Sequence, residues 1–175
     1  YNMAGWRIGL CAGNATMVNA LGTIKGYYDY GVFQPVQIAS IIAMRECDAD
    51  VRRQARVYQG RRDVVIEGCQ RLGWQAESCR ASMFVWARVG DEHLQGKGTL
   101  GLCMRLMEEA EVALAPGRAF GENGENYVRI ALVENEQRLR QAFRQMARAL
   151  GCAPIVQPRK KAARESDAGR KRPRR

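Results

Sequence analysis

The fold class follows from two neighbouring segments, Trp74-Gln-Ala-Glu-Ser-Cys79 and Met83-Phe-Val-Trp-Ala-Arg-Val89. Residue character in both changes with a period of two, and aromatic and β-branched residues are frequent, which is typical of β-strands. We therefore predict that the two segments pair as strands of one layer. Further strands are predicted at Tyr127-Val-Arg-Ile-Ala-Leu132 and at Val112-Ala-Leu-Ala115, which Pro116-Gly117 ends.

Helical patterns lie on both sides of these strands. Asp48 begins a long predicted helix that Gly73 ends, with apolar residues on one side and many arginines on the other. Residues 90–98 are predicted to form a polar loop, after which Thr99 caps a helix. Asn135 caps the last predicted helix. The apolar stripe of that helix consists of Leu139, Ala142, Phe143, Met146 and Leu150.

The first 47 residues carry a strand and helix pattern of their own. The run Arg7-Ile-Gly-Leu-Cys11 is short and apolar, which indicates a buried strand. Asn14 then caps a helix that continues to about Lys25, and Pro35 fits the first turn of a second helix. This second helix has too many apolar residues to be exposed. They are Ile38, Ile41, Ile42 and Met44.

Composition and cysteine usage narrow the class of protein. The chain has 175 residues and is 46% apolar, which is ordinary for a globular protein of one domain or slightly more. No apolar run is long enough for a membrane helix, so we expect no membrane association. The six cysteines are scattered and the only histidine is His93, which argues against a metal site. Reduced thiols and a cytoplasmic location fit this pattern.

The net charge of +10 is concentrated at the C-terminus. Residues 159–175 contain nine Lys or Arg against two acidic residues, a local charge of +7, which leaves +3 for residues 1–158. Apolar periodicity stops beyond Pro154, so residues 153–175 are predicted to be a basic disordered tail. Such a tail permits nonspecific, salt-sensitive binding to nucleic acid. A nucleic-acid binder is therefore one alternative function.

Two arginines stand out because they interrupt apolar strand patterns. Arg129 lies in the middle of a predicted strand, and Arg7 lies at the entrance to another. Arg129 can be an edge-strand residue whose head reaches water, and Arg7 can be a turn residue that caps a carbonyl. Alternatively, each guanidinium can bind an anion, because its planar fork matches a carboxylate or phosphate. The residues alone leave these alternatives open.

The order of several motifs resembles that of the class I/II (fold-type I) pyridoxal-phosphate (PLP) aminotransferases. The likeness begins with Tyr1-Asn-Met-Ala-Gly-Trp-Arg-Ile-Gly9, which resembles the segment that follows the Schiff-base lysine in that family. It continues through residues 27–35 and covers about residues 1–150. The other matching motifs are Ala81-Ser-Met-Phe-Val-Trp86, Ala115-Pro-Gly117 with Phe120-Gly121, and Val128-Arg-Ile-Ala-Leu-Val-Glu-Asn135. The likeness is greatest to the alanine (glutamate–pyruvate) branch, near the diaminopimelate aminotransferases.

The resemblance implies roles for both arginines. Arg7 matches the arginine that binds the PLP phosphate, and Arg129 matches the one that binds the substrate α-carboxylate. The Schiff-base lysine of the family would lie just upstream of Tyr1, so no catalytic residue is assigned within the chain. Lys25 and Lys97 lie in a helix end and a polar loop, and neither replaces it. We therefore expect this stretch alone to be inactive.

The resemblance also implies an α/β architecture. Residues 1–47 would end a three-layer large PLP-binding domain, residues 48–73 would form a connecting long helix, and residues 74–152 would form a C-terminal small α+β domain. The intact protein would be a homodimer that transfers an amino group from an amino acid to a 2-oxo acid. Tyr27, Tyr28 and Tyr30 would then lie near a neighbouring subunit's site or in an aromatic patch. Another alternative is a truncated, lysine-less paralogue that acts as an interaction module.

Overall fold

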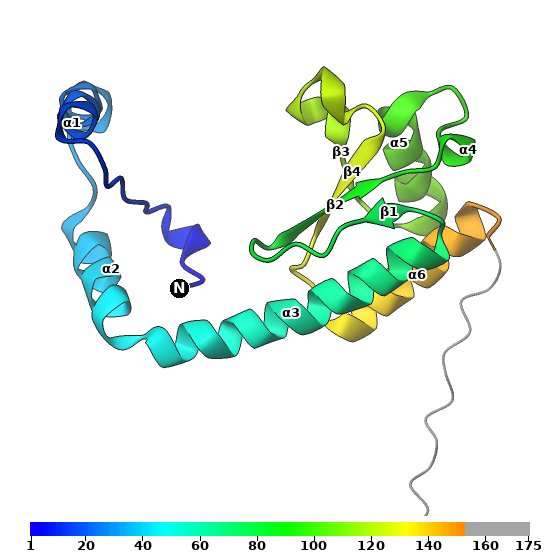
Figure 1. The fold of residues 1–175 in the computed structure, drawn as a ribbon, viewed down its shortest axis with the longest axis horizontal. Helices are drawn as coiled ribbons and strands as arrows, with labels where there is room; N and C mark the ends of the chain where they lie inside the picture. The colour runs from blue at the N-terminus through cyan, green and yellow to red at the C-terminus, as the bar shows by residue number, and fades with distance from the viewer. Residues whose placement is uncertain (153–175) are drawn as a thin grey trace, which may run out of the picture.

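The computed structural model describes residues 1–152, and the predicted basic tail lies outside them. Three helices come first, a four-stranded sheet and three further helices follow, and the architecture is mixed α/β (Figure 1). The first three helices are α1 (Ala15–Asp29), α2 (Gln34–Glu46) and α3 (Asp48–Arg71). The strands are β1 (Gln75–Ala76), β2 (Phe84–Arg88), β3 (Ala115–Pro116) and β4 (Tyr127–Ala131), and the later helices are α4 (Asp91–Leu94), α5 (Gly98–Ala110) and α6 (Glu136–Ala149).

The predicted strand over residues 7–11 does not form. A short 3-10 helix, η1 (Ala4–Trp6), comes first, and the segment from Ile8 to Gly13 has no regular structure and is mostly exposed. A strand needs a neighbour to satisfy its backbone N–H and C=O groups. No strand of the described chain lies beside this segment, so the apolar pattern alone cannot form a ladder.

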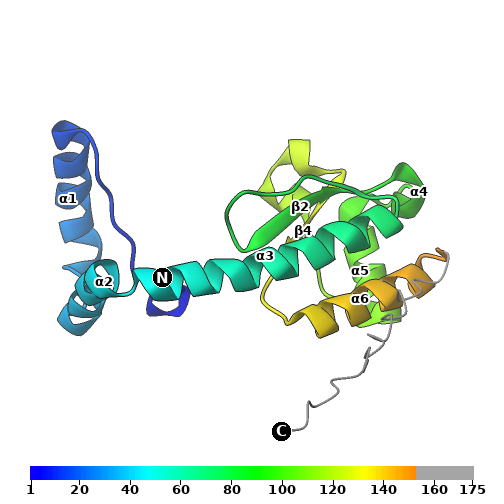
Figure 2. The same ribbon diagram turned by 60° about the horizontal axis from the view of Figure 1, so that its bottom comes forward.

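Asn14 begins α1 as predicted, because its side-chain oxygen accepts hydrogen bonds from the backbone N–H groups of Thr16 and Met17. Pro35 lies in the first turn of α2, also as predicted. The expected burial of α2 is wrong for the described chain: Ala43 is its only buried residue, and Ile38 is 50% exposed. Both helices lie at the end of α3 that is remote from the sheet, where no other described element covers them (Figure 2).

The sheet is antiparallel throughout, with the strand order β1-β2-β4-β3. Trp86 pairs with Arg129 and Val85 with Ile130 across β2 and β4, so these pairs lie on opposite faces. The predicted pairing of residues 74–79 with residues 83–89 is confirmed by β1 and β2, and the strand predicted at Tyr127 is β4. Strand β3 begins at Ala115, later than predicted, because residues 112–114 do not pair with β4.

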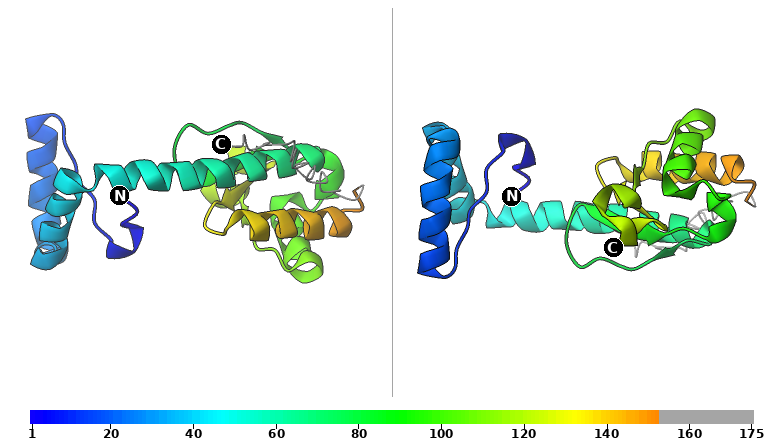
Figure 3. Two further views of the ribbon diagram at one scale, coloured as in Figure 1. Left: turned by 90° about the horizontal axis from the view of Figure 1, so that it is seen from below. Right: turned by 90° about the horizontal axis from the view of Figure 1, so that it is seen from above.

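One face of the sheet is buried against α3, α5 and α6. Helices α3 and α6 run side by side beneath it (Figure 3). They meet at Gly68 and Phe143, where the missing side chain of Gly68 leaves room for the aromatic ring. The sheet contributes Val85, Ala87, Val128 and Ile130 to this core, and the helices contribute Val65, Cys69, Leu102, Leu106, Phe143 and Met146. The opposite face carries Phe84, Trp86, Arg88, Tyr127 and Arg129.

The region between β2 and α5 differs from the prediction. The expected polar loop contains α4, whose Leu94 is buried. Helix α5 begins at Gly98, and Thr99 is not its cap: the hydroxyl of Thr99 is buried without a hydrogen-bond partner. The backbone N–H of Thr99 is instead satisfied by the Glu125 carboxylate, which accepts its hydrogen bond at 3.2 Å. A distant side chain has therefore taken the capping role.

The cysteines of the described chain are all free thiols. No helix among residues 1–152 is long and apolar enough to cross a membrane. Within the same residues, no group of three or more His, Cys, Asp or Glu side chains is arranged to hold a metal ion. The domain boundaries expected from the sequence stay a prediction, although the buried core draws its residues from position 64 onward.

Candidate functional site

Arg129 lies at the centre of the open face of the sheet. Its strand β4 is hydrogen-bonded to β2 on one side and β3 on the other, so the edge-strand alternative is wrong. The side chain is half-buried. Its guanidinium carbon lies 4.3 Å from the ring centroid of Phe84 and 4.5 Å from that of Phe120. Each contact is favourable because the negative π-face of a ring attracts a cation.

Two further aromatic residues complete this surface. The Trp86 ring stacks on Tyr127 with centroids 5.4 Å apart and an interplanar angle of 14°. Phe120 meets Trp86 edge to face at 5.7 Å. Both geometries are the preferred ones for aromatic pairs. The result is a connected aromatic surface around one cation.

Phe120 reaches this surface from the 117–125 loop, which is closely packed. Gly117 and Gly124 approach so closely that a Cβ on Gly117 would overlap the Gly124 carbonyl oxygen. At the end of the loop, the Glu125 carboxylate accepts hydrogen bonds from the Thr99 N–H and, at 3.0 Å, from the Arg118 guanidinium. The loop is therefore held to the N-terminus of α5, where a negative charge is favoured.

The Arg129 guanidinium has no anionic partner among residues 1–152, because no ion pair or hydrogen bond joins its side chain to another described residue. Contacts to ring faces use none of its N–H donors. A half-buried cation whose donors are unused is suited to bind a carboxylate or phosphate in a bidentate manner. The arrangement can hold an anion above the sheet.

Arg7 lies on the N-terminal segment and not on the sheet. Its backbone adopts the left-handed conformation with φ 54°, which is uncommon for a residue with a side chain. Its guanidinium donates a hydrogen bond to the Ala4 carbonyl at 3.2 Å, as expected for a turn arginine, and the residue is exposed. No described carboxylate pairs with it, so most of its donors are available to a phosphate group. Arg7 and Arg129 share no contact in this structure.

The tyrosines that were expected near a neighbouring subunit's site or in an aromatic patch lie at the end of α1 and just beyond it. Tyr27, Tyr28 and Tyr30 are 84%, 84% and 95% exposed. They neither pack against the core nor contact the Arg129 surface. Their proposed role at an interface stays a prediction.

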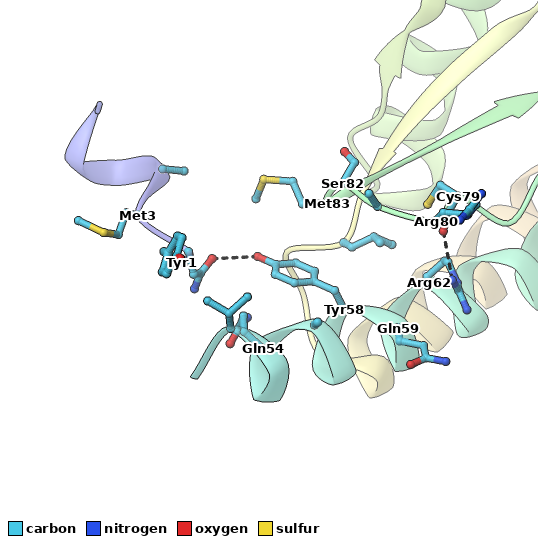
Figure 4. Close-up of a pocket in the computed structure, with 16 residues that line it drawn as sticks. Tyr1, Met3, Gln54, Tyr58, Gln59, Arg62, Cys79, Arg80, Ser82 and Met83 are labelled. Carbon is cyan, nitrogen blue, oxygen red and sulfur yellow. Dashed lines mark hydrogen bonds between the residues drawn. The ribbon is translucent and has the colours of Figure 1, made fainter. Parts of the chain in front are cut away.

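One hollow beside the N-terminal segment has a volume of about 700 Å³. It lies between that segment, α3 and the loop of residues 79–83 (Figure 4). Tyr58 of α3 donates a hydrogen bond to the Asn2 side chain at 3.2 Å, and Arg62 donates one to the Cys79 carbonyl at 3.1 Å. These two contacts connect α3 to both walls of the hollow. Arg62 is also paired with Asp63, so it is less suited than Arg129 to bind an anion.

Sequence reasoning missed two structural roles. Arg61 donates hydrogen bonds to the Leu132 carbonyl at 2.9 Å and the Val133 carbonyl at 3.2 Å, and so satisfies the backbone where β4 ends. His93 accepts a hydrogen bond from the Trp74 indole at 3.0 Å, and its other nitrogen lies 3.6 Å from the Cys152 sulfur. The arginines of α3 all have similar surroundings in sequence, so no local signal distinguished Arg61.

A family model, "Aminotransferase class I and II", matches residues 1–145. The chain is 46% identical over 157 residues to glutamate-pyruvate aminotransferase AlaC of Escherichia coli (strain K12), and the match covers 88% of this chain and 38% of that protein. It is 39% identical over 151 residues to an LL-diaminopimelate aminotransferase of Moorella thermoacetica, with 86% of this chain and 38% of that protein covered.

A solved structure with a similar fold is also an aminotransferase. A probable N-succinyldiaminopimelate aminotransferase from Thermus thermophilus superposes with a TM-score of 0.75 at 34% identity, and the match covers 85% of this chain and 39% of that structure. The chain thus spans about 38% of the length of the curated relatives named above. The agreement of family model, sequence identity and fold leads to one conclusion: the chain belongs to the class I and II aminotransferase family.

Proposed function

We propose that the chain is the C-terminal part of a PLP-dependent aminotransferase, and that Arg129 binds the α-carboxylate of its substrates. One observation carries this proposal: a half-buried guanidinium at the centre of the sheet contacts two aromatic rings and has no ion pair with any described residue. Membership of the family supports it, because an amino acid and a 2-oxo acid both present a carboxylate next to the reacting carbon. One arginine can therefore serve both substrates.

Arg129 would contribute by orientation. A carboxylate held by two parallel N–H···O bonds cannot rotate freely, so the adjacent Cα–H bond is fixed relative to the reacting group. The PLP ring, when bound, withdraws electrons from that carbon. Arg7 fits the PLP phosphate, because it is exposed and most of its guanidinium donors are unused by the described residues. The lysine that carries PLP in this family is expected to precede Tyr1.

The substrates are proposed to be of the alanine and glutamate–pyruvate type. The supporting observation is the 46% identity to glutamate-pyruvate aminotransferase AlaC, compared with 39% to an LL-diaminopimelate aminotransferase. The intact protein is proposed to act as a homodimer, with the exposed tyrosines at the end of α1 as candidates for the subunit interface. Without the lysine, residues 1–175 alone are not expected to transaminate.

The test uses the intact protein with alanine and 2-oxoglutarate as substrates. Arg129→Ala removes the carboxylate contact and is expected to lower kcat/KM by about 100-fold or more, since a charged hydrogen bond at a binding site contributes on the order of 3 kcal/mol. Arg88→Ala is the matched control, because Arg88 lies on the same face of the sheet but is exposed and lacks contact with Phe120. Equal losses in the two variants would contradict the proposed role of Arg129.

A further inference from the structure

The position of Phe120 is not explained by burial. Its side chain is 54% exposed, and it lies on a surface loop, yet its ring contacts both Arg129 and Trp86. An exposed aromatic residue gains little from the hydrophobic effect at such a position. The 117–125 loop that carries Phe120 is nevertheless closely packed, because the backbones of Gly117 and Gly124 lie directly against each other. This combination indicates that the ring has a role at Arg129.

We propose that Phe120 and Phe84 form an aromatic clamp that positions the Arg129 guanidinium for carboxylate binding, and that Glu125 keeps Phe120 in this clamp. The proposal rests on the proposed carboxylate role of Arg129. Phe84 belongs to β2 and is fixed by the sheet, whereas Phe120 depends on its loop. The two rings restrict a long side chain that would otherwise move among several rotamers.

The clamp leaves the recognition chemistry unchanged. Rings at 4.3 Å and 4.5 Å from the guanidinium carbon restrain the group without accepting its N–H hydrogens, so all donors stay available for a ligand. A restrained guanidinium loses less entropy when it binds a carboxylate, which raises the affinity for the ligand. Phe120 is thus a positioning residue that acts through Arg129.

Glu125 acts one step farther away. Its carboxylate joins the end of the 117–125 loop to the Thr99 N–H and to Arg118. Its replacement by Ala would remove both contacts and let the loop, with Phe120, move away from Arg129. Glu122 is the matched control, because it lies in the same loop, is exposed and has no ion pair within the described residues.

The experiment compares Phe120→Leu, Phe120→Tyr, Glu125→Ala, Glu122→Ala and Arg129→Ala in the intact holoenzyme. The first readout is competitive inhibition by propionate, a carboxylate without an amino group. The second is the rate of reaction with ethylamine, an amine without a carboxylate. Kinetic constants for alanine are measured in parallel, together with the melting temperature of each variant.

We expect Phe120→Leu to weaken propionate binding about tenfold and to raise KM for alanine by a similar factor, with kcat and the ethylamine rate nearly unchanged. Phe120→Tyr keeps the ring and should retain wild-type values. Glu125→Ala should show the pattern of Phe120→Leu to a smaller degree, and Glu122→Ala should show none of it. Only a loss that is specific to carboxylates supports the clamp, because a general structural defect would also slow ethylamine.

Several outcomes would overturn the proposal. They are wild-type propionate affinity in Phe120→Leu, an equal loss in Phe120→Tyr, or an ethylamine rate that falls together with the affinity. Arg129→Ala separates this inference from the proposed function. If Arg129→Ala binds propionate normally, the proposed carboxylate role itself fails; if it loses binding while Phe120→Leu does not, only the clamp is wrong.

Discussion

The backbone of Gly68 lies directly against the ring of Phe143, so that a methyl group added at Gly68 would overlap Cγ of that ring. Gly68 belongs to α3 and Phe143 to α6, so the absence of one side chain sets how closely the two helices approach. Both residues are buried, and the residues around them form the core beneath the sheet. The position of the sheet, and of Arg129 on its other face, depends on this contact.

Gly68→Ala should destabilise the protein. Alanine favours a helix by up to about 1 kcal/mol over glycine, but overpacking a buried contact typically costs about 1–3 kcal/mol or more. Urea unfolding should therefore show a net loss. The matched control is Gly60→Ala in the same helix, where an added methyl group meets only the flexible Glu136 carboxylate at 2.7 Å. Gly60→Ala should be neutral or stabilising, and equal effects of the two variants would refute this packing argument.

Asn135→Ala should remove the N-cap of α6. The Asn135 side-chain oxygen accepts a hydrogen bond from the Arg138 N–H at 3.0 Å, and loss of such a cap costs about 1 kcal/mol. The urea concentration at the midpoint of unfolding should fall, while the slope of the unfolding free energy against urea concentration should stay unchanged. Asn135→Asp retains the acceptor and should keep most of the stability. A loss as large in Asn135→Asp as in Asn135→Ala would show that the cap is not the cause.

His93→Ala should leave a buried donor without a partner. Trp74 is 2% exposed, and its indole N–H donates to His93 Nδ1. An unsatisfied buried donor costs about 1–3 kcal/mol, so the variant should unfold at lower urea concentration, as monitored by tryptophan fluorescence. His93→Gln supplies a replacement acceptor and should recover part of the loss. Wild-type stability in His93→Ala would contradict this role.

Two buried thiols should make the folded state sensitive to alkaline pH. Burial raises the pKa of the Cys69 thiol to about 12 and that of Cys103 to about 11. The native state therefore keeps these protons at pH values where the unfolded chain releases them, so the free energy of unfolding falls as the pH rises from about 8.5 toward the folded values.

The measurement is urea unfolding between about pH 7 and pH 11, the range in which the unfolded thiols lose their protons. In Cys69→Ala the free energy of unfolding should fall less steeply with pH than in the wild type. The difference should be up to about 1.4 kcal/mol per pH unit, because the variant lacks one titrating proton. Cys11→Ala, which changes an exposed thiol, should follow the wild-type curve. In the native protein Cys11 should react with a thiol reagent far faster than Cys69. Parallel curves for all three proteins would show that the Cys69 thiol has no such effect.

The sequence predicted those elements whose signals are local. Asn14 and Asn135 cap their helices because an Asn side chain reaches N–H groups two or three residues later. Strands β1 and β2 pair as expected and β4 forms where it was predicted, since the alternation of buried and exposed residues fixes which face enters the core. Arg129 was identified as a candidate because a cation interrupts this pattern.

Features that depend on distant partners could not be predicted in the same way. The segment after Arg7 has the composition of a strand but no pairing strand in the described chain. Thr99 has the residue type of a cap, yet Glu125, which is far away in sequence, caps its backbone. The contact of Phe120 with Arg129 depends on the path of a loop, and the path of a loop cannot be predicted from the spacing of apolar residues.

Helix α3 is one continuous element, but its stability differs along its length. Its buried residues are Val64, Val65, Gly68 and Cys69, all in the second half. Amide hydrogens beside these residues are released to solvent only when the core opens, whereas those of the first half exchange through local fraying. The protection of the backbone against deuterium exchange should therefore rise along the helix, and the boundary would divide the chain into two cooperative folding units within a single uninterrupted helix.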